Sequence, residues 1–254
     1  RRVTPKVFLI GESAIGPGME KYLEFIGTKW RPDVRLSCGE QIVEFMGRLC
    51  YRSWEPGMNP NIKKVREGNE KYLGNILKQK HGSVFEHPVT HWVFADVSRV
   101  FTHELVRHRA GCAYSQESLR YVRLEDLGLW LPPEIEADPV VKDMFEKAFE
   151  DLEDLQKRMA VVLQIDGKPF GEKKKLTSAM RRVAPIGLAT AIGASFNFRT
   201  LRHIIEMRTA EGAEAEIRFV IGEVARIAKD RWPSAFQDLI KGDSGEWQLE
   251  FSKV

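Results

Sequence analysis

Twice along this chain, an apolar strand-like segment runs directly into a helix, and this pattern limits the folds that the chain can adopt. Residues 88–97 are rich in β-branched and aromatic side chains, which favours a strand, and Ser98 then stands where a helix N-cap is expected. Residues 187–197 are typical of a second buried strand, and helical spacing follows at once over 198–208. Two such junctions in a chain whose predicted helices outnumber its strands favour an α+β fold.

Weaker patterns predict the remaining elements. Short strands are expected at 6–11 and 119–122, and further helices at 17–26, 39–52, 61–80, 138–164, 171–183, 213–232 and 234–240. Helices thus outnumber strands, and the sequence contains no internal repeat and no low-complexity linker. We predict one α+β domain over residues 1–254, with a central mixed or antiparallel sheet flanked by helices.

Composition narrows the class of protein. The chain has 254 residues, of which 43% are hydrophobic, enough for a sizeable core. No apolar run approaches the roughly 20 residues that a membrane span requires, and the run that starts at Val7 is too short for a secretory signal. The three cysteines, Cys38, Cys50 and Cys112, are odd in number and far apart, which indicates neither a disulfide framework nor a cysteine-rich zinc site. We therefore expect a cytoplasmic protein without a membrane partner.

The charge is balanced overall but not locally. With 39 basic and 36 acidic residues the net charge is only +3, which disfavours a dedicated nucleic-acid binder. Basic residues nevertheless outnumber acidic ones around 99–123 and around 173–182. A local excess within a balanced chain favours a small anionic ligand over a nucleic acid.

The densest polar segment is RHRAGCAYSQESLRY, residues 107–121. Arg107, Arg109 and Arg120 provide guanidinium groups, which bind phosphate in a fork-shaped geometry. The same segment carries His108, Tyr114, Ser115, Gln116, Ser118 and Tyr121. Hydroxyl and amide groups among the arginines can bind a base or a sugar. The segment predicts a pocket for an anionic, hydrogen-bonding small molecule.

The histidines raise the question of a metal site, since five of the six lie between His81 and His108. His103 and His108 are five residues apart, which places them about 140° apart around a helix, so they do not share one helical face. His87 and His91 lie in a strand-like segment without an obvious partner carboxylate. We expect no metal.

Two side chains of the 107–121 segment are candidate nucleophiles. The flanking arginines could activate Cys112, but no base is placed in order around it, and a small loop residue is the favoured interpretation. Ser118 lacks a surrounding GxSxG motif, which favours a substrate-binding hydroxyl.

Glu104 stands just before this segment, on the helix expected after Ser98. If that helix continues, Arg107 and His108 follow Glu104 by three and four residues and share its face. The alternative is an exposed ion pair of little energetic value.

A second group of polar and basic residues is Arg181, Arg182, Asn197, Arg199, Arg202, His203 and Arg208. Arginines on exposed helices usually contact only water, so this group alone would not indicate a site. The polar segment 107–121 elsewhere in the chain is the reason to expect that this group also binds a ligand.

Five ordered motifs resemble those of the flavin-dependent thymidylate synthases. They are HGSVFEH at 81–87, THELVRHR at 102–109, YSQESLRY at 114–121, RRVAP at 181–185 and NFRTLRHIIEMR at 197–208. The resemblance covers about residues 82–239. It implies a methyltransferase that makes thymidylate from deoxyuridylate with FAD, NADPH and methylenetetrahydrofolate, in a homotetramer with active sites at subunit interfaces. It also implies that reduced flavin passes on the one-carbon unit and hydride, and that no protein nucleophile attacks the pyrimidine.

The resemblance further assigns roles to individual residues. FAD would contact His81, Ser83, Arg107, His108, Arg109, Ser115, Asn197, Arg199 and His203. Deoxyuridylate would contact Glu104, Arg107, Gln116, Ser118, Leu119, Arg120, Arg181 and Arg208. Catalytic roles would fall to Arg208, Ser118 and His81, with Arg208 stabilising negative charge on the uracil ring.

The chain departs from the family pattern in two places. Eight residues, 110–117, separate RHR from Ser118 where the family has seven, so the extra residue falls in the loop 110–113. It is either absorbed as a bulge or shifts Arg107 and Arg109. Gly212 stands where the family often has histidine. Two alternatives therefore stay open: a relative that modifies another pyrimidine nucleotide or adds another one-carbon group, and a non-catalytic nucleotide- or RNA-binding protein.

Overall fold

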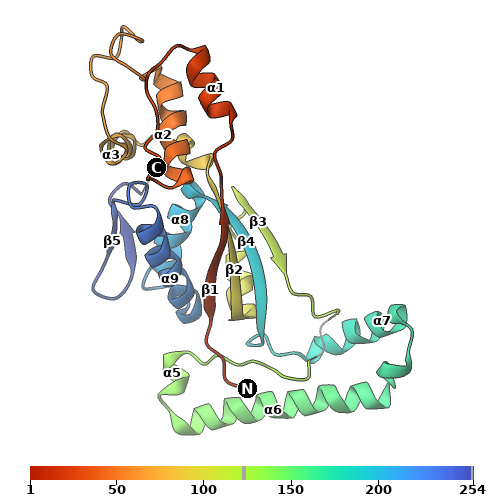
Figure 1. Ribbon diagram of the computed structural model, residues 1–254. Coiled ribbons are helices and arrows are strands. Elements are labelled where there is room, and N and C mark those ends of the chain that lie inside the picture. Colours follow the sequence, from red (N-terminus) through yellow and green to blue (C-terminus); the bar gives the residue numbers. More distant parts are fainter. Residues whose placement is uncertain (122–123, 253) are drawn as a thin grey trace.

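A four-stranded antiparallel sheet forms the centre of the computed structural model, which describes residues 1–121, 124–252 and 254 (Figure 1). Its strands lie in the order β1-β2-β4-β3. Their bounds are β1 Lys6–Glu12, β2 Val89–Ser98, β4 Ala189–Asn197 and β3 Cys112–Gln116. The α+β prediction is confirmed, and the sheet is antiparallel rather than mixed.

Three helices cover one face of the sheet: α4 (Arg99–Leu105), α8 (Phe198–Thr209) and α9 (Ala215–Arg231). Side chains alternate along the strands, and those on the covered face, such as Trp92 and Phe196, are fully buried against the helices. A two-stranded sheet of β5 (Leu239–Lys241) and β6 (Trp247–Leu249) packs beside α8.

Both strand-to-helix junctions form as the sequence predicted. The hydroxyl of Ser98 accepts a hydrogen bond from the backbone N–H of Phe101 at 3.1 Å, and the side-chain oxygen of Asn197 accepts one from Thr200 at 2.8 Å. Each side chain satisfies an N–H group that the first turn of its helix leaves free. β2 and β4 therefore pass directly into α4 and α8.

The N-terminal part forms a layer at one end of the sheet (Figure 1). Its elements are α1 (Gly18–Phe25), α2 (Cys38–Tyr51), α3 (Asn69–Lys78) and the short 3₁₀ helix η1 (Gly82–Glu86). The helix expected at 61–80 is wrong over its first part, because α3 begins only at Asn69. Gly68 has a φ of 84°, a conformation that glycine adopts readily and that ends any continuous helix there.

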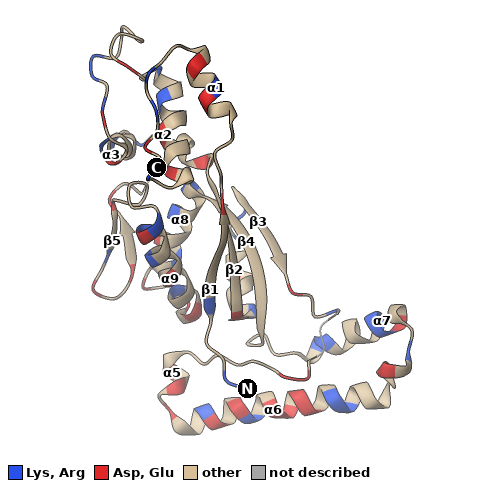
Figure 2. Cartoon of the chain, viewed as in Figure 1, with Lys and Arg blue, Asp and Glu red and all other residues tan. Residues whose placement is uncertain are grey.

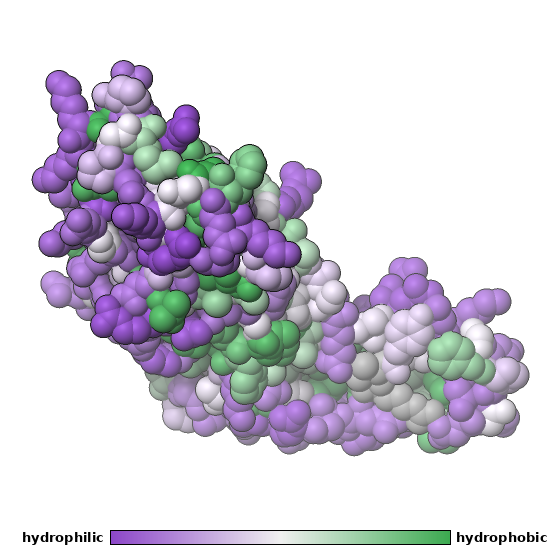
Figure 3. All heavy atoms as spheres, turned by 45° about the horizontal axis from the view of Figure 1, so that its top comes forward, coloured by the Kyte–Doolittle hydropathy of each residue, from purple (hydrophilic) through white to green (hydrophobic). Residues whose placement is uncertain are grey.

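A helical arm extends from the other end of the sheet (Figure 1). It contains α5 (Pro133–Glu136), α6 (Pro139–Val162), η2 (Ile165–Gly167), α7 (Phe170–Met180) and η3 (Arg181–Val183). Charges of both signs line α6 (Figure 2). Large apolar side chains are also exposed on the arm, among them Met144, Val161, Val162 and Phe170. Figure 3 shows the arm standing apart from the main body, with apolar patches between polar ones.

Two other predicted elements are wrong. Residues 119–121 form a turn, in which Tyr121 donates to the carbonyl of Ser118 at 3.0 Å, and position 122 lies outside the described residues. The strand lies earlier, at β3. The helix expected at 234–240 is a turn followed by β5. The N–H groups of Ser234 and Ala235 bond to the carboxylate of Glu40 at 2.7 and 3.3 Å, so a tertiary contact determines the backbone there.

No helix in residues 1–121, 124–252 and 254 is both long and apolar enough to cross a membrane.

A buried ion pair joins α8 to the turn before β5. Two nitrogens of Arg202 donate to the two carboxylate oxygens of Asp238, each at 2.8 Å, and both side chains are only 1% exposed. Arg202 also donates to the carbonyl of Ala235 at 3.0 Å. Since neither charge reaches water, each depends on the other for compensation.

We expect Arg202→Met to lower the free energy of unfolding by about 3–5 kcal/mol, because it leaves the carboxylate of Asp238 buried without its cation. Urea denaturation followed by circular dichroism measures this. The control is Arg226→Met, since Arg226 pairs with Glu223 and Asp230 on the exposed face of α9 and should matter little. Equal effects of the two substitutions would contradict the assignment of Arg202 as a buried structural cation.

Candidate active site

A cleft of about 610 Å³ opens where β4 ends and α8 begins. The first turns of α8 supply Asn197, Arg199, Thr200 and His203 to its wall. The loop after α4 supplies Arg107, His108, Arg109, Ala110 and Gly111, and Glu86, Ser252 and Val254 complete the lining. Three guanidinium groups and the N-terminus of a helix thus face one space, an arrangement that attracts anions.

Helix α4 ends earlier than its sequence pattern predicts. It stops at Leu105, so the expectation that Glu104, Arg107 and His108 share one helical face is wrong. The hydroxyl of Tyr114 donates to the carbonyl of Leu105 at 2.9 Å and to that of His108 at 2.8 Å. In a continuing helix the Leu105 carbonyl would accept from residue 109. The chain turns away instead, and Arg107 and Arg109 reach the cleft.

The 110–113 loop contains a glycine turn. Gly111 has a φ of 68°, and a Cβ atom there would lie 2.5 Å from both Asn197 Nδ2 and Thr200 Oγ1. Thr200 donates to the carbonyl of Ala110 at 2.8 Å. The turn therefore packs closely against the start of α8, and β3 pairs regularly with β4 from Cys112 onward.

Arg208 joins the two strand-to-helix units from the far end of α8. Its Nη1 lies 2.8 Å from a carboxylate oxygen of Glu104, and its Nη2 donates to the Glu104 carbonyl at 3.1 Å. Its Nε donates to Nε2 of His108 at 2.8 Å. The carboxylate and the backbone carbonyl of Glu104 and the ring of His108 thus hold Arg208 in one orientation. Only part of the Arg208 side chain is exposed.

His108 is a neutral acceptor in this contact. Burial, followed by the positive charge of Arg208 and then that of His203, lowers the pKa of His108 to about 4. The ring of His203 lies edge-on to that of His108, with centroids 5.7 Å apart. An uncharged imidazole avoids repulsion between adjacent cations at the cleft.

Six of the nine residues expected to contact FAD line this cleft. They are Arg107, His108, Arg109, Asn197, Arg199 and His203. His81 and Ser83 flank Gly82, where a Cβ atom would lie 2.7 Å from Arg199 Nε, and the ring of His81 stacks on Tyr51 with centroids 5.3 Å apart. Ser115 is exposed on β3 and does not line the cleft.

Most residues expected to contact deoxyuridylate lie elsewhere. Gln116 ends β3, and its amide donates to Thr102 Oγ1 at 3.1 Å. Ser118 begins the turn that follows, Leu119 is buried in a small apolar cluster, and Arg120 is exposed. The five residues of β3, roughly 13–17 Å long, separate this turn from the cleft.

Arg99 was not recognised from the sequence as a candidate. Its Nη1 is buried without a hydrogen-bond partner among the described residues. Burial and the nearby charge of Arg181 lower the pKa of Arg99. Two cations placed together, one of them unpaired, are typical of a site that binds an anion. The only signal in the sequence was the excess of basic residues around 99–123.

Cys112 does not have the features of a nucleophile. Burial raises the pKa of its thiol, which disfavours the reactive thiolate. Within residues 1–121, 124–252 and 254, no group of three or more His, Cys, Asp or Glu side chains is arranged to hold a metal ion.

We expect the stability of the protein to fall as the pH drops from about 6.5 towards about 4, in part because of His108. In this window the unfolded imidazole takes up a proton that the folded one does not, so protonation favours unfolding. His108→Gln should show a weaker fall, measured by urea denaturation at a series of pH values, whereas His87→Gln, an exposed control, should follow the wild type. Identical curves for all three proteins would contradict a buried neutral His108.

Comparison with known proteins shows which family the chain belongs to. Residues 35–234 match the family model described as "Thymidylate synthase complementing protein". The chain is 31% identical over 218 residues to the flavin-dependent thymidylate synthase of Corynebacterium diphtheriae, covering 84% of this chain and 83% of that protein. The enzymes of that name from Mycobacteroides abscessus and Mycolicibacterium vanbaalenii are each 36% identical, over 79% and 82% of this chain and 79% and 84% of their own lengths. The chain therefore belongs to the family of flavin-dependent thymidylate synthases.

Proposed function

We propose that this protein converts deoxyuridylate to thymidylate by reductive methylation, with bound FAD, methylenetetrahydrofolate as carbon donor and NADPH as reductant. In the net reaction, the methylene carbon replaces the hydrogen on C5 of uracil and becomes a methyl group. NADPH supplies the two electrons, and tetrahydrofolate and NADP⁺ are released. The observation that carries this proposal is the cleft at the start of α8, where six expected FAD residues meet.

The cleft suits a dinucleotide. Its volume of about 610 Å³ lies in the usual range for cofactor sites. Arg107 and Arg109 are exposed and form no ion pair with a described carboxylate, so both are available to a pyrophosphate. Arg199, paired with Glu86, adds a third guanidinium. Bound FAD, once reduced, would supply the hydride that the net reaction requires.

Arg208 is suited to stabilise negative charge on the uracil ring. Glu104 and neutral His108 fix its guanidinium before any ligand binds, so little reorganisation is needed during the reaction. We propose that Ser118 and His81 take part by positioning the substrate and the cofactor. The burial of Cys112 supports a route without a protein nucleophile.

The phosphate of the nucleotide is proposed to bind Arg99 and Arg181. The unpaired Nη1 of Arg99 supports this, because an anion would compensate both charges. Glu104, Arg107, Gln116, Ser118, Leu119, Arg120 and Arg208 would complete the nucleotide site.

We propose a homotetramer in which active sites form between copies of the chain. Within one copy, the cleft and the turn at Ser118 lie at opposite ends of β3, so a site that uses both requires a second copy. The exposed apolar residues of the arm supply contact surface for such an assembly. A monomer by light scattering would contradict this arrangement.

The remaining features of the chain fit the same proposal. Buried side chains from residues 43–105 and from residues 192–254 share one core, which supports one domain over residues 1–254. The near-balanced charge supports an enzyme without a nucleic-acid partner, and we further propose that it is cytoplasmic and has no membrane partner.

The first test is flavin binding followed by product analysis. The purified protein should bind FAD, show a flavin spectrum that changes with deoxyuridylate, and give thymidylate by mass spectrometry. A panel of uridine and cytidine nucleotides tests for another substrate. Failure to bind FAD would overturn the proposal. Binding without any methylated product, and without growth of a thymidine-requiring strain, would favour a nucleotide-binding protein instead.

The second test is Arg208→Lys. A point charge replaces a fixed fork, so kcat/KM should fall by about 100-fold or more, while the thermal unfolding midpoint stays close to that of the wild type. Arg226→Lys, on the exposed side of α9, is the matched control and should keep wild-type kinetics. Near-normal turnover of Arg208→Lys would remove Arg208 from the mechanism.

A further inference from the structure

A segment near the end of the chain lines the cofactor cleft although it lies outside the family match. The match covers residues 35–234, whereas Ser252 and Val254 belong to the wall of the cleft beside Arg199 and His203. No motif in the sequence predicted a role for either residue. Their place in the wall is therefore a feature of this chain that the family match does not account for.

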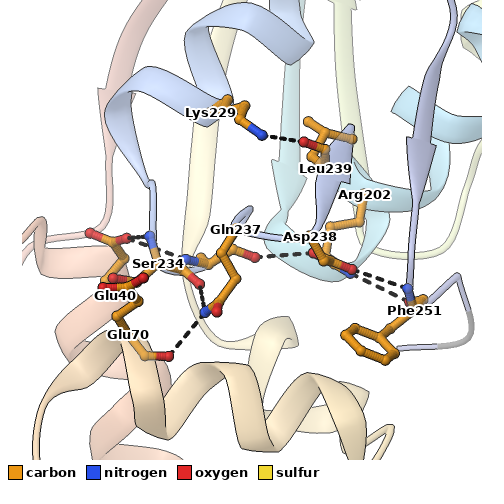
Figure 4. A network of polar contacts seen from close by, with 10 residues as sticks. Glu40, Glu70, Arg202, Lys229, Ser234, Gln237, Asp238, Leu239 and Phe251 are labelled. Carbon is orange, nitrogen blue, oxygen red and sulfur yellow. Dashed lines mark hydrogen bonds and ion pairs between the residues drawn. The ribbon is translucent and has the colours of Figure 1, made fainter. Parts of the chain in front are cut away.

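The segment is anchored by the buried ion pair of α8. Asp238, held by Arg202, accepts a hydrogen bond from the N–H of Phe251 at 3.2 Å, and Arg202 itself donates to the Phe251 carbonyl at 3.4 Å (Figure 4). The N–H of Glu250 bonds to the Asp238 carbonyl at 3.2 Å. Arg202 lies one turn from Arg199 on α8. One helix thus holds the segment and also supplies guanidinium and imidazole groups to the cleft.

Val254 and Arg199 both lie close to Gly82. A Cβ atom on Gly82 would clash with the backbone carbonyl carbon of Val254 and lie 2.7 Å from Arg199 Nε. Val254 is only 7% exposed and packs into the main core. The contact is therefore close enough that any side chain at position 82 must displace either the segment or the arginine.

We propose that Ser252 and Val254 form a wall of the FAD site, and that this wall positions Arg199 and sets how tightly the cleft binds the cofactor. Ser252 is exposed within the cleft, where it can contact the ligand, and Val254 acts through Arg199 as a positioning residue. The proposal rests on the proposed function, since it presumes that FAD is the ligand.

The first experiment places a negative charge in the wall. Ser252→Glu adds a carboxylate beside the arginines without disturbing a buried group, so it should raise the Kd for FAD about tenfold or more. Ser244→Glu, the same change in the exposed turn between β5 and β6, should leave Kd within about twofold. FAD fluorescence titration of the full chain measures both, and thermal unfolding confirms that the variants are folded.

The second experiment disturbs the packing of Val254 and Arg199 next to Gly82. Gly82→Ala should raise the Kd for FAD by a similar factor, because the methyl group displaces one of them. Gly222→Ala is the control, since a Cβ atom at Gly222 meets nothing within 4 Å. If Gly82→Ala does not fold, Ser252→Glu decides alone.

The outcomes distinguish this inference from the proposed function. The unsubstituted protein is titrated first, and its failure to bind FAD overturns the proposed function together with this inference. If it binds FAD but Ser252→Glu binds equally well, only the inference is overturned. Tighter binding by either variant would also overturn it, because the segment would then obstruct the cleft instead of forming part of the site.

Discussion

The antiparallel pairing of β2 with β4 is the constraint on which the other parts of this structure depend. Val89 lies opposite Asn197 at one end and Ser98 lies near the other, so the two capped junctions stand at opposite ends of the pair. Helices α4 and α8 consequently start from opposite ends and return over the same face of the sheet. That return brings the end of α4, with Glu104, beside the far end of α8, with Arg208. The start of α8 is left open as the cleft.

Buried carboxylates hold the irregular backbone around this pair. Glu216 accepts from the N–H of Ser98 at 2.6 Å, Glu40 from that of Ser234 at 2.7 Å, and Asp238 from that of Phe251 at 3.2 Å. Buried backbone N–H groups need acceptors. These three acids provide them, and Figure 4 shows the contacts of Glu40 and Asp238.

Local patterns in the sequence predicted those parts of the fold that local chemistry determines. The apolar strands, the cap at Ser98, the helix directly after residue 197 and the long helix of the arm all depend on neighbours in the sequence. Local patterns did not predict where α4 ends, because the hydroxyl of Tyr114, on a later strand, determines that position. The turn at Ser234 depends on Glu40 in the same way. The arginine motifs indicated residues that line the cleft at the start of α8, whereas the place of Val254 in its wall depends on tertiary packing.

The topology of the central sheet has a consequence for how the protein folds. Every strand pairing in this sheet joins residues far apart in the sequence, such as Glu12 with Thr90, Ser98 with Ala189 and Gln116 with Ile192. Pairings between residues far apart in sequence form slowly, because loop closure precedes the contacts that stabilise them. We expect the sheet to form late in folding, after the local helices of the arm and of the N-terminal part. The turn at Gly111, which rests on α8 and leads into β3, would then be ordered late as well, so that the cleft is completed only when the sheet closes.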